Sequence, residues 1–154
     1  MRIGWFLKHE EINGGEVCPT YLHRWTLLKT RGWVLYLHKF VGDDWSRDFH
    51  DHPSRFWSIG LWGRYVETSL SHSIDGLGQY GYPTATTREY RAPWVRSFPA
   101  EHRHRIVLTG KRRYCWTLAI HGPQKRKWGF WQGGRFIPWR LYVDEEAASN
   151  RTCE

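Results

Sequence analysis

Long hydrophobic runs are missing from this sequence. The apolar run at residues 3–7 is shorter than the apolar region of a secretory signal, and charged residues follow it directly. No run approaches the roughly 20 apolar residues that cross a bilayer, so no membrane association is expected. Cysteine is also scarce, and the three thiols, Cys18, Cys115 and Cys153, show no C-x-x-C spacing. Such thiols are typical of a reducing compartment, which predicts a cytoplasmic protein.

Helical periodicity and two common catalytic motifs are absent as well. No segment before the acidic C-terminal tail carries apolar residues at helical spacing over a useful length. The sequence has no glycine-rich phosphate loop and no G-x-S-x-G elbow. It therefore gives no support to nucleophilic hydrolase chemistry.

Short segments rich in β-forming residues make up most of the chain. Turn residues separate these segments, and residues 71–87 are expected to form a long loop. Many short strands without intervening helices predict an all-β sandwich or barrel. We expect one domain over residues 1–143 and an acidic tail at 144–154 that forms a frayed helix. The expected strands cover residues 33–41, 56–69, 88–98, 105–108, 114–120 and 128–139, with a hairpin turn at 110–113.

Tryptophan is unusually abundant, with eleven copies in 154 residues, and aromatic residues reach 17%. This composition does not fit a disordered chain. Tryptophan can stack on nucleic-acid bases, but in a small β-sandwich it more often fills the core. We therefore expect most of the tryptophans to pack in the core or to line a pocket.

Two histidines one residue apart, His50 and His52, carry the strongest chemical signal. Side chains alternate along a strand, so these imidazoles point to one face while Asp51 points to the other. A second pair, His102 and His104, can supply a third nitrogen ligand. Three imidazoles from two strands form a metal site with open positions, as catalysis requires. The competing interpretation is that paired histidines only satisfy the end of a strand.

The first histidine pair resembles the first of two short motifs in the cupin superfamily. That motif has two histidines separated by one residue, then a glutamate, then a glycine. His50, His52 and Gly63 fit this order, whereas Phe56 or Trp57 stands where the glutamate belongs.

The second pair resembles the second cupin motif, in which a proline precedes a histidine by five residues. Pro99 and His104 fit that spacing, but Glu101 replaces the usual glycine and Leu108 replaces the usual asparagine. Both histidine clusters are thus present, while the usual carboxylate ligand is absent.

A wider resemblance covers most of the chain and points to small, uncharacterised cupin-like proteins of phages and bacteria. It implies a jelly-roll barrel of cupin type and favours His104 over His102 as the ligand. It implies no particular reaction, because this fold carries many chemistries. The segments that carry the resemblance are residues 21–25, 50–53, 104–106, 116–118, 122–123, 128–131 and 138–140.

A site of three neutral imidazoles leaves the +2 charge of an ion uncompensated, which favours an anionic substrate. Imidazole ligands suit Fe, Zn, Ni or Cu, and a three-histidine set resembles the thiol-dioxygenase branch of the cupins. The hypothesis is a metal-dependent oxygenase or isomerase that acts on a small anionic molecule. A carboxylate ligand stays open, because Glu67, Glu89 or Glu101 can approach from another part of the chain.

Three further residues are candidates for a catalytic role. His23 and His38 occur in similar contexts and can serve as a general base or orient a ligand near the site. Arg64 can contact a substrate anion. The alternative for both histidines is a structural role between strands, and for Arg64 a position on a surface strand.

A net charge of +8 keeps a nucleic-acid role open. Lys125, Arg126 and Lys127 form a basic run beside aromatic residues, a mixture that can contact phosphates and stack on bases. The alternative is a solvated turn. A non-catalytic cupin-like binding module and a homodimer also remain open.

Overall fold

The computed structural model describes residues 7–13, 19–44, 48–71, 84–111 and 113–142. The expected tail at 144–154, Cys18, Cys153 and most of the expected loop at 71–87 lie outside these residues. No helix in the described part of the chain is long and apolar enough to span a bilayer.

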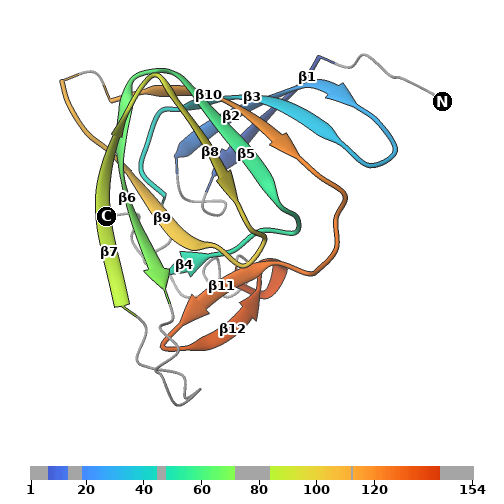
Figure 1. Cartoon of the computed structure of the whole chain (residues 1–154), viewed down its shortest axis with the longest axis vertical. Helices are drawn as coiled ribbons and strands as arrows, with labels where there is room; N and C mark the ends of the chain where they lie inside the picture. Colours follow the sequence, from blue (N-terminus) through green and yellow to red (C-terminus); the bar gives the residue numbers. More distant parts are fainter. Residues whose placement is uncertain (1–6, 14–18, 45–47, 72–83, 112, 143–154) are drawn as a thin grey trace.

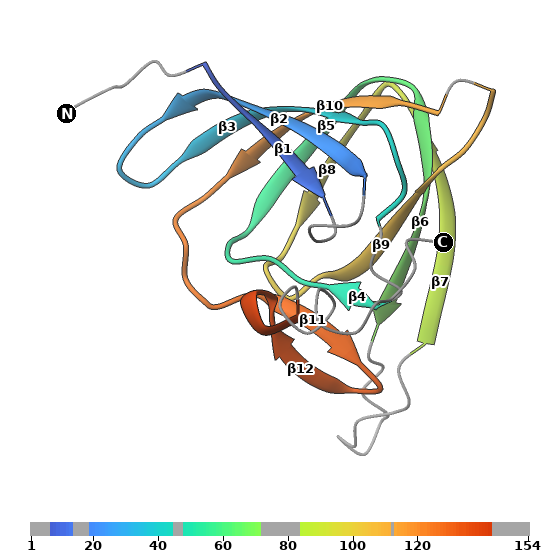
Figure 2. The same ribbon diagram turned by 180° about the vertical axis from the view of Figure 1, so that it is seen from behind.

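Twelve strands form two six-stranded antiparallel sheets that face each other, as Figures 1 and 2 show from opposite sides. From β3 to β6 and again from β7 to β11, successive strands pass from one sheet to the other. This arrangement confirms the predicted all-β jelly roll. Sheet 1 contains, in spatial order, β1 (Lys8–Asn13), β2 (Thr20–Lys29), β3 (Val34–Phe40), β10 (Cys115–His121), β5 (Phe56–Trp62) and β8 (Trp94–Phe98). Sheet 2 contains β12 (Arg135–Pro138), β11 (Gly129–Gln132), β4 (Phe49–His50), β9 (Arg103–Leu108), β6 (Arg64–Ser71) and β7 (Thr84–Arg91).

The segment at 56–69, expected as one strand, is two strands that belong to different sheets. Gly63 separates β5 from β6 and has a φ of 89°, a conformation that side chains with a Cβ rarely adopt. A Cβ there would lie 2.4 Å from the carbonyl oxygen of Tyr114, so the close approach also requires glycine. The segment at 88–98 likewise divides into β7 and β8.

The expected hairpin turn at 110–113 is wrong. It connects β9 of sheet 2 to β10 of sheet 1, and these strands do not pair with each other. Turn residues in a sequence indicate a connection between strands, but they do not show which strand comes next in the sheet.

The interior is divided along the strands into an apolar part and a polar part. Ile106 and Leu108 face inward from β9 and pack with Tyr65 and Cys115 into a buried cluster. His104 lies on the same inward face of β9, one alternation before Ile106. One strand therefore supplies both the hydrophobic core and the histidine cluster.

Most tryptophans lie outside the core, contrary to the expectation. No tryptophan of the described residues is fully buried, although Trp94 packs against the core cluster. Trp116 alternates with the buried Cys115 and Thr117 on β10, so it faces away from the interior and stacks on Trp25 at 5.7 Å. Sheet 1 thus carries apolar side chains on both faces, a pattern that alternation alone does not predict.

Asp51 fastens the end of β4 to the β11–β12 hairpin. Its side chain is fully buried and accepts hydrogen bonds from the backbone N–H of Gly129 and the indole N–H of Trp131, each at 3.0 Å. The Arg126 guanidinium lies 2.9 Å from the same carboxylate and compensates its charge. A buried carboxylate with these three partners holds the segment between the two histidines in one position.

Asp51→Asn should lower the free energy of unfolding by about 3 kcal/mol, because the amide nitrogen cannot accept these bonds and a buried ion pair is broken. Chemical denaturation measures this change. Glu101→Gln, at an exposed position, is the control and should change stability by less than about 0.5 kcal/mol. Equal stability of the two variants would contradict the proposed role of Asp51.

Candidate metal centre

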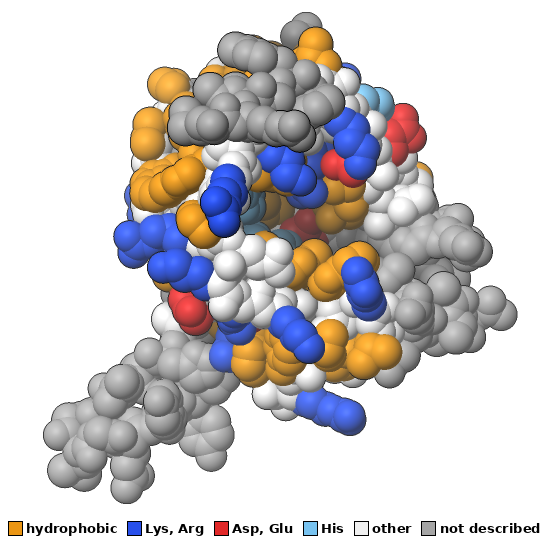
Figure 3. Space-filling model, turned by 90° about the vertical axis from the view of Figure 1, so that its right-hand side faces the viewer, with side chains coloured by type: hydrophobic (Ala, Val, Ile, Leu, Met, Phe, Trp, Pro, Cys, Tyr) orange, Lys and Arg blue, Asp and Glu red, His pale blue; other side chains and the backbone are white. Residues whose placement is uncertain are grey.

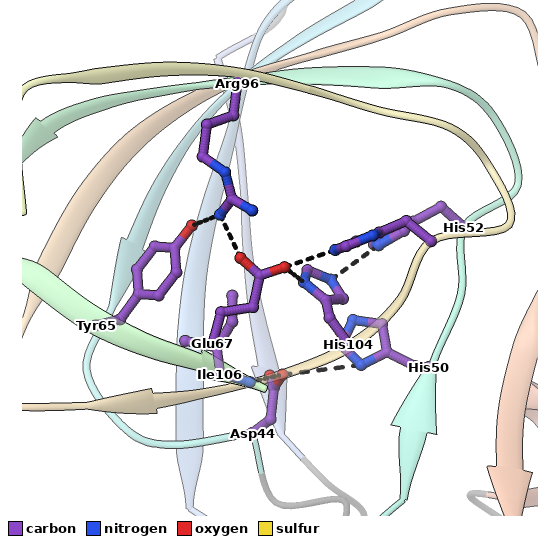
Figure 4. Close-up of polar contacts among 9 residues, drawn as sticks. Asp44, His50, His52, Tyr65, Glu67, Arg96, His104 and Ile106 are labelled. Atoms are coloured by element: carbon purple, nitrogen blue, oxygen red, sulfur yellow. Dashed lines mark hydrogen bonds and ion pairs between the residues drawn. The ribbon is translucent and has the colours of Figure 1, made fainter. Parts of the chain in front are cut away.

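His50, His52 and His104 converge between the two sheets, as Figure 4 shows. His50 on β4 lies opposite His104 on β9, with ring centroids 4.7 Å apart. The Nε2 atoms of His52 and His104 are 2.9 Å apart, and one nitrogen from each of the three rings lies within 4.8 Å of the others. The three predicted ligands therefore form a group that can hold a metal ion.

The two histidines of the first pair reach this group in a different way from that expected. Strand β4 ends at His50, so His52 lies in the following turn and not on the same strand. The backbone N–H of His52 donates to the carbonyl oxygen of Ala100 at 2.9 Å, which places His52 beside the start of β9.

Carboxylates lie behind two of the three imidazoles. Glu67 Oε1 is 3.2 Å from Nδ1 of His104, and Asp44 Oδ2 is 3.8 Å from Nδ1 of His50. Asp44 is itself fixed by the backbone N–H of Ile106 at 2.9 Å. The Glu67 carboxylate, within hydrogen-bond distance of Nδ1 of His104, keeps the proton on that nitrogen and leaves the Nε2 lone pair of His104 free to bind a metal. The donor set thus fits a metal ion at the Nε2 side of the rings.

Glu67 is the one carboxylate of the three sequence candidates that reaches the histidines. It comes from β6 and is only 2% exposed, while Glu89 pairs with Arg64 at 3.4 Å and Glu101 is exposed. Besides His104, Glu67 contacts Nε2 of His102 at 2.5 Å. The Arg96 guanidinium of β8 forms an ion pair with Glu67 and donates to the Tyr65 hydroxyl at 3.2 Å (Figure 4).

The charge of Glu67 is maintained in spite of its burial. Burial raises the pKa of the carboxyl, but hydrogen bonds from His102 and His104, the charge of His104 and a hydrogen bond from Arg96 together hold that pKa well below its usual range. Glu67, His102 and His104 are also close enough to hold a metal. In that set, however, Glu67 already has three partners, which favours a role in orienting the histidines.

His52 and His104 are neutral and ready to act as ligands near neutral pH. Burial lowers the pKa of His104 to about 4, although the nearby Glu67 carboxylate opposes the shift. Burial, followed by the neighbouring His104 and His50, lowers the pKa of His52 well below its ordinary value. A neutral imidazole keeps the lone pair that a metal requires.

Aromatic rings and one arginine line the interior beside the histidines. Phe56 lies 4.3 Å from His52 and stacks on His121 at 5.0 Å, measured between ring centroids. His121 in turn meets the edge of Tyr36, and the Arg24 guanidinium lies over Tyr36 at 4.8 Å. Figure 3 shows a hollow in this face of the molecule, with histidine and acidic side chains at its floor and Lys and Arg around its rim.

Several solved structures share this fold at low sequence identity. HppE, a hydroxypropylphosphonic acid epoxidase, in its Fe(II) form covers 74% of this chain and 56% of its own, with a TM-score of 0.53 and 10% identity. An oxalate decarboxylase variant from Bacillus subtilis covers 73% of this chain and 28% of its own, with a TM-score of 0.51 and 18% identity. The oxalate decarboxylase has also been described with Mn(II) centres. The chain spans about half the length of HppE and less than a third of the decarboxylase.

This chain has the cupin fold. No family model matches the sequence, and no curated protein sequence matches it significantly. The similarity therefore establishes the architecture, and the site must be argued from its own residues.

The structure separates the other catalytic candidates. His38 faces the interior from β3 and accepts a hydrogen bond from Nε of Arg24 at 3.0 Å. His23 lies on the outer face of sheet 1 beside His9. Arg64 alternates with the buried Tyr65 on β6 and pairs with Glu89 on the outside. His38 alone is placed in the interior, and neither His23 nor Arg64 is brought to the three histidines.

The basic run at 125–127 is divided in the structure. Lys125 and Lys127 are exposed, whereas Arg126 is half-buried by its ion pair with Asp51 and its bond to the carbonyl oxygen of Ala100. Arg126 is therefore part of the fold, and two lysines are left to meet a nucleic acid.

Sequence reasoning missed Asp44, Arg96 and Arg24. Arg24 and Arg96 face the interior by strand alternation, and Asp44 lies in a loop that contacts β9. None of the three belongs to a recognisable motif. The available signal was the position of Arg24 between Leu22 and Thr26, its two neighbours on the same face of β2, which are both buried.

The unfolding free energy of the metal-free protein should fall as the pH falls from about 6.5 to about 4. The pKa values of His104 and His121 in the fold are about 4, so over this range the unfolded chain binds more protons than the folded chain. Lower pH therefore favours the unfolded state. Glu67 adds to the loss of stability below a pH of about 4.5, the usual pKa of a glutamate, because its pKa in the fold is lowered. Burial raises the pKa of Asp44, which acts in the opposite direction.

His38→Gln isolates one such group, because the amide oxygen can still accept the Arg24 bond but does not titrate. Burial first, and then Arg24, lowers the pKa of His38 well below 6.5. In the variant, the unfolding free energy should change less steeply with pH, by up to about 1.4 kcal/mol per pH unit. Urea denaturation in the presence of a chelator measures the unfolding free energy of both proteins at each pH. At pH 8, where the histidine is neutral in both the folded and the unfolded chain, the difference between wild type and variant reports the change in packing alone. An unchanged slope would contradict a buried, neutral His38.

Proposed function

We propose that this chain is a metal-dependent enzyme that binds one divalent transition ion through His50, His52 and His104. The observation that carries the proposal is the placement of three imidazoles, one nitrogen of each within 4.8 Å of the others, two of them with a carboxylate beside Nδ1. An ion about 2.1 Å from two nitrogens at a right angle needs those nitrogens about 3.0 Å apart. The 2.9 Å between His52 and His104 meets this requirement.

The metal is proposed to be Fe(II). Imidazole ligands accept Fe, Zn, Ni or Cu, and the HppE structure that shares this fold contains Fe(II). The Mn(II) of the oxalate decarboxylase is the second choice. When bound, such an ion supplies Lewis acidity or redox chemistry to a molecule that occupies its open positions.

The proposed substrate is a small anion. The three ligands are neutral, and the charge of Glu67 is already compensated by Arg96, so the +2 charge of the ion remains to attract an anion. The substrate class is otherwise open, and both an oxygenase and an isomerase fit this arrangement.

Arg24 is proposed to bind the anionic group. Its Nε donates to His38, and among the described residues no partner is seen for its terminal N–H groups. Its charge lowers the pKa of both His38 and His121, which places it in the polar part of the interior. The rings of Phe56 and His121 lie between His52 and Tyr36, so successive ring contacts connect the proposed metal ligands to Arg24.

The alternatives differ in what they predict. A non-catalytic cupin-like module would bind the ion and the anion without turnover. A nucleic-acid binder would lose affinity steeply with salt, and Lys125→Glu with Lys127→Glu would weaken it while leaving the metal site intact. The kinship with small phage and bacterial cupin-like proteins also stays a prediction.

Purified protein reconstituted with Fe(II) without oxygen should retain close to one ion per chain after desalting. His104→Asn should retain almost none, because it removes a ligand and the contact to Glu67. Glu67→Gln should weaken binding by about 10- to 100-fold, since it changes an outer partner only. His38→Gln is the control and should keep the ion. Elemental analysis measures these values, and full occupancy of His104→Asn would refute the ligand assignment.

Arg24→Gln should weaken binding of a probe anion, oxalate or methylphosphonate, by at least about tenfold, the usual loss for a charged hydrogen bond. Metal content should not change. Arg64→Gln is the matched control, because Arg64 lies on the outer face. Calorimetric titration of the metal-loaded protein measures both. Equal losses from the two variants would show that general charge, and not Arg24, holds the anion.

A further inference from the structure

A second group of potential ligands lies on the outer face of sheet 1, at its β1 edge. His9 and Glu11 are two residues apart on β1 and share a face, and Glu11 lies opposite His23 of β2 in the strand register. His9 Nε2 is 3.2 Å from His23 Nδ1, and His23 Nδ1 is 3.8 Å from Glu11 Oε1. One ligand atom from each residue lies within 4.8 Å of the others.

The spacing of the two nitrogens matches a tetrahedral ion. Zinc binds imidazole nitrogen at about 2.0–2.1 Å, and at a tetrahedral angle two such nitrogens are about 3.3 Å apart. The observed 3.2 Å between His9 and His23 needs almost no adjustment. The carboxylate of Glu11, 3.8 Å from Nδ1 of His23, must move closer to coordinate the ion, and its exposed side chain permits this movement.

Neighbouring side chains hold the three ligands in place. Trp25 stacks on His9 with ring centroids 4.7 Å apart and on His23 at 6.0 Å, so that the two imidazole planes differ by only 15°. The Thr20 hydroxyl donates to Glu11 Oε2 at 3.3 Å. Ordered ligands lower the entropic cost of binding an ion.

The nearby positive charges are engaged elsewhere. Lys8 pairs with Glu10, which alternates with Glu11 and therefore points to the opposite face of β1. Lys39 lies opposite His23 on β3, but its ammonium is directed to the rings of Trp116 and Tyr114 at 5.5 and 5.8 Å. Neither lysine therefore pairs with the Glu11 carboxylate.

We propose that His9, Glu11 and His23 form a second metal site, for a divalent transition ion of the zinc type. Two imidazoles and one carboxylate are a common zinc donor set, and they leave a fourth position to water or another ligand. This site shares no residue with the centre between the sheets and does not depend on it. The ion would join the edge strand β1 to β2 by side chains as well as by backbone hydrogen bonds.

Equilibrium dialysis against ZnCl2 tests the proposal on the full chain. The wild type should bind two ions, and His104→Asn, which disables the inner centre, should bind one. His23→Asn should bind one, and adding His104→Asn to it should leave none. Glu11→Gln, at an exposed position that cannot disturb the core, should weaken the outer site by about tenfold or more, at least as much as loss of an outer-shell partner does.

Glu10→Gln is the matched control, because it lies on the same strand and faces the other way. It should bind as much zinc as the wild type. The proposal is overturned if His23→Asn and Glu11→Gln both bind zinc as the wild type does, because the 3.2 Å contact is then only a hydrogen bond between two imidazoles. Failure of the inner centre gives a different result: His104→Asn would match the wild type, while the outer variants would still lose an ion.

Discussion

The buried charge of Glu67 is the constraint on which the interior depends. Its partners come from both sheets, since Arg96 belongs to β8 of sheet 1 and His104 to β9 of sheet 2. A carboxylate that is 2% exposed is stable only if it is compensated and hydrogen-bonded. The same contacts that satisfy this charge also fix the ring of His104. Glu67 therefore both joins the two sheets and orients His104.

The division of the interior follows from the order of residues on a few strands. On β9 the inward positions are His104, Ile106 and Leu108, and on β6 they are Tyr65 and Glu67. Polar residues meet at one end of these strands and apolar residues at the other. The polar end can remain open to ligands because the apolar end supplies the packing that stabilises the sandwich.

The all-β class was predictable from the sequence, because strand alternation is a local signal. The H-x-H spacing drew attention to His50 and His52, which do lie close to His104, although His52 follows the end of β4 and does not share its strand. The division at Gly63 was not predictable, since a bent strand and a crossing between sheets look the same locally. Glu67 was named only as one of three carboxylates, because its approach to His104 depends on how β6 pairs with β9. The place of the tryptophans was misjudged, because alternation shows that two faces exist but not which one is covered.

Asp51 has a consequence for the C-terminal hairpin. It lies between His50 and His52 in the chain and bonds to Gly129 and Trp131 of β11. In the proposed function, docking of β11 and β12 and binding of an ion by the histidines would favour each other, and thermodynamic reciprocity would require the two effects to be equal in free energy. A ligand that tightens the centre would thereby reduce the fraction of molecules with a detached hairpin. The β11–β12 hairpin would thus report the occupancy of the proposed metal site, to which it contributes no ligand.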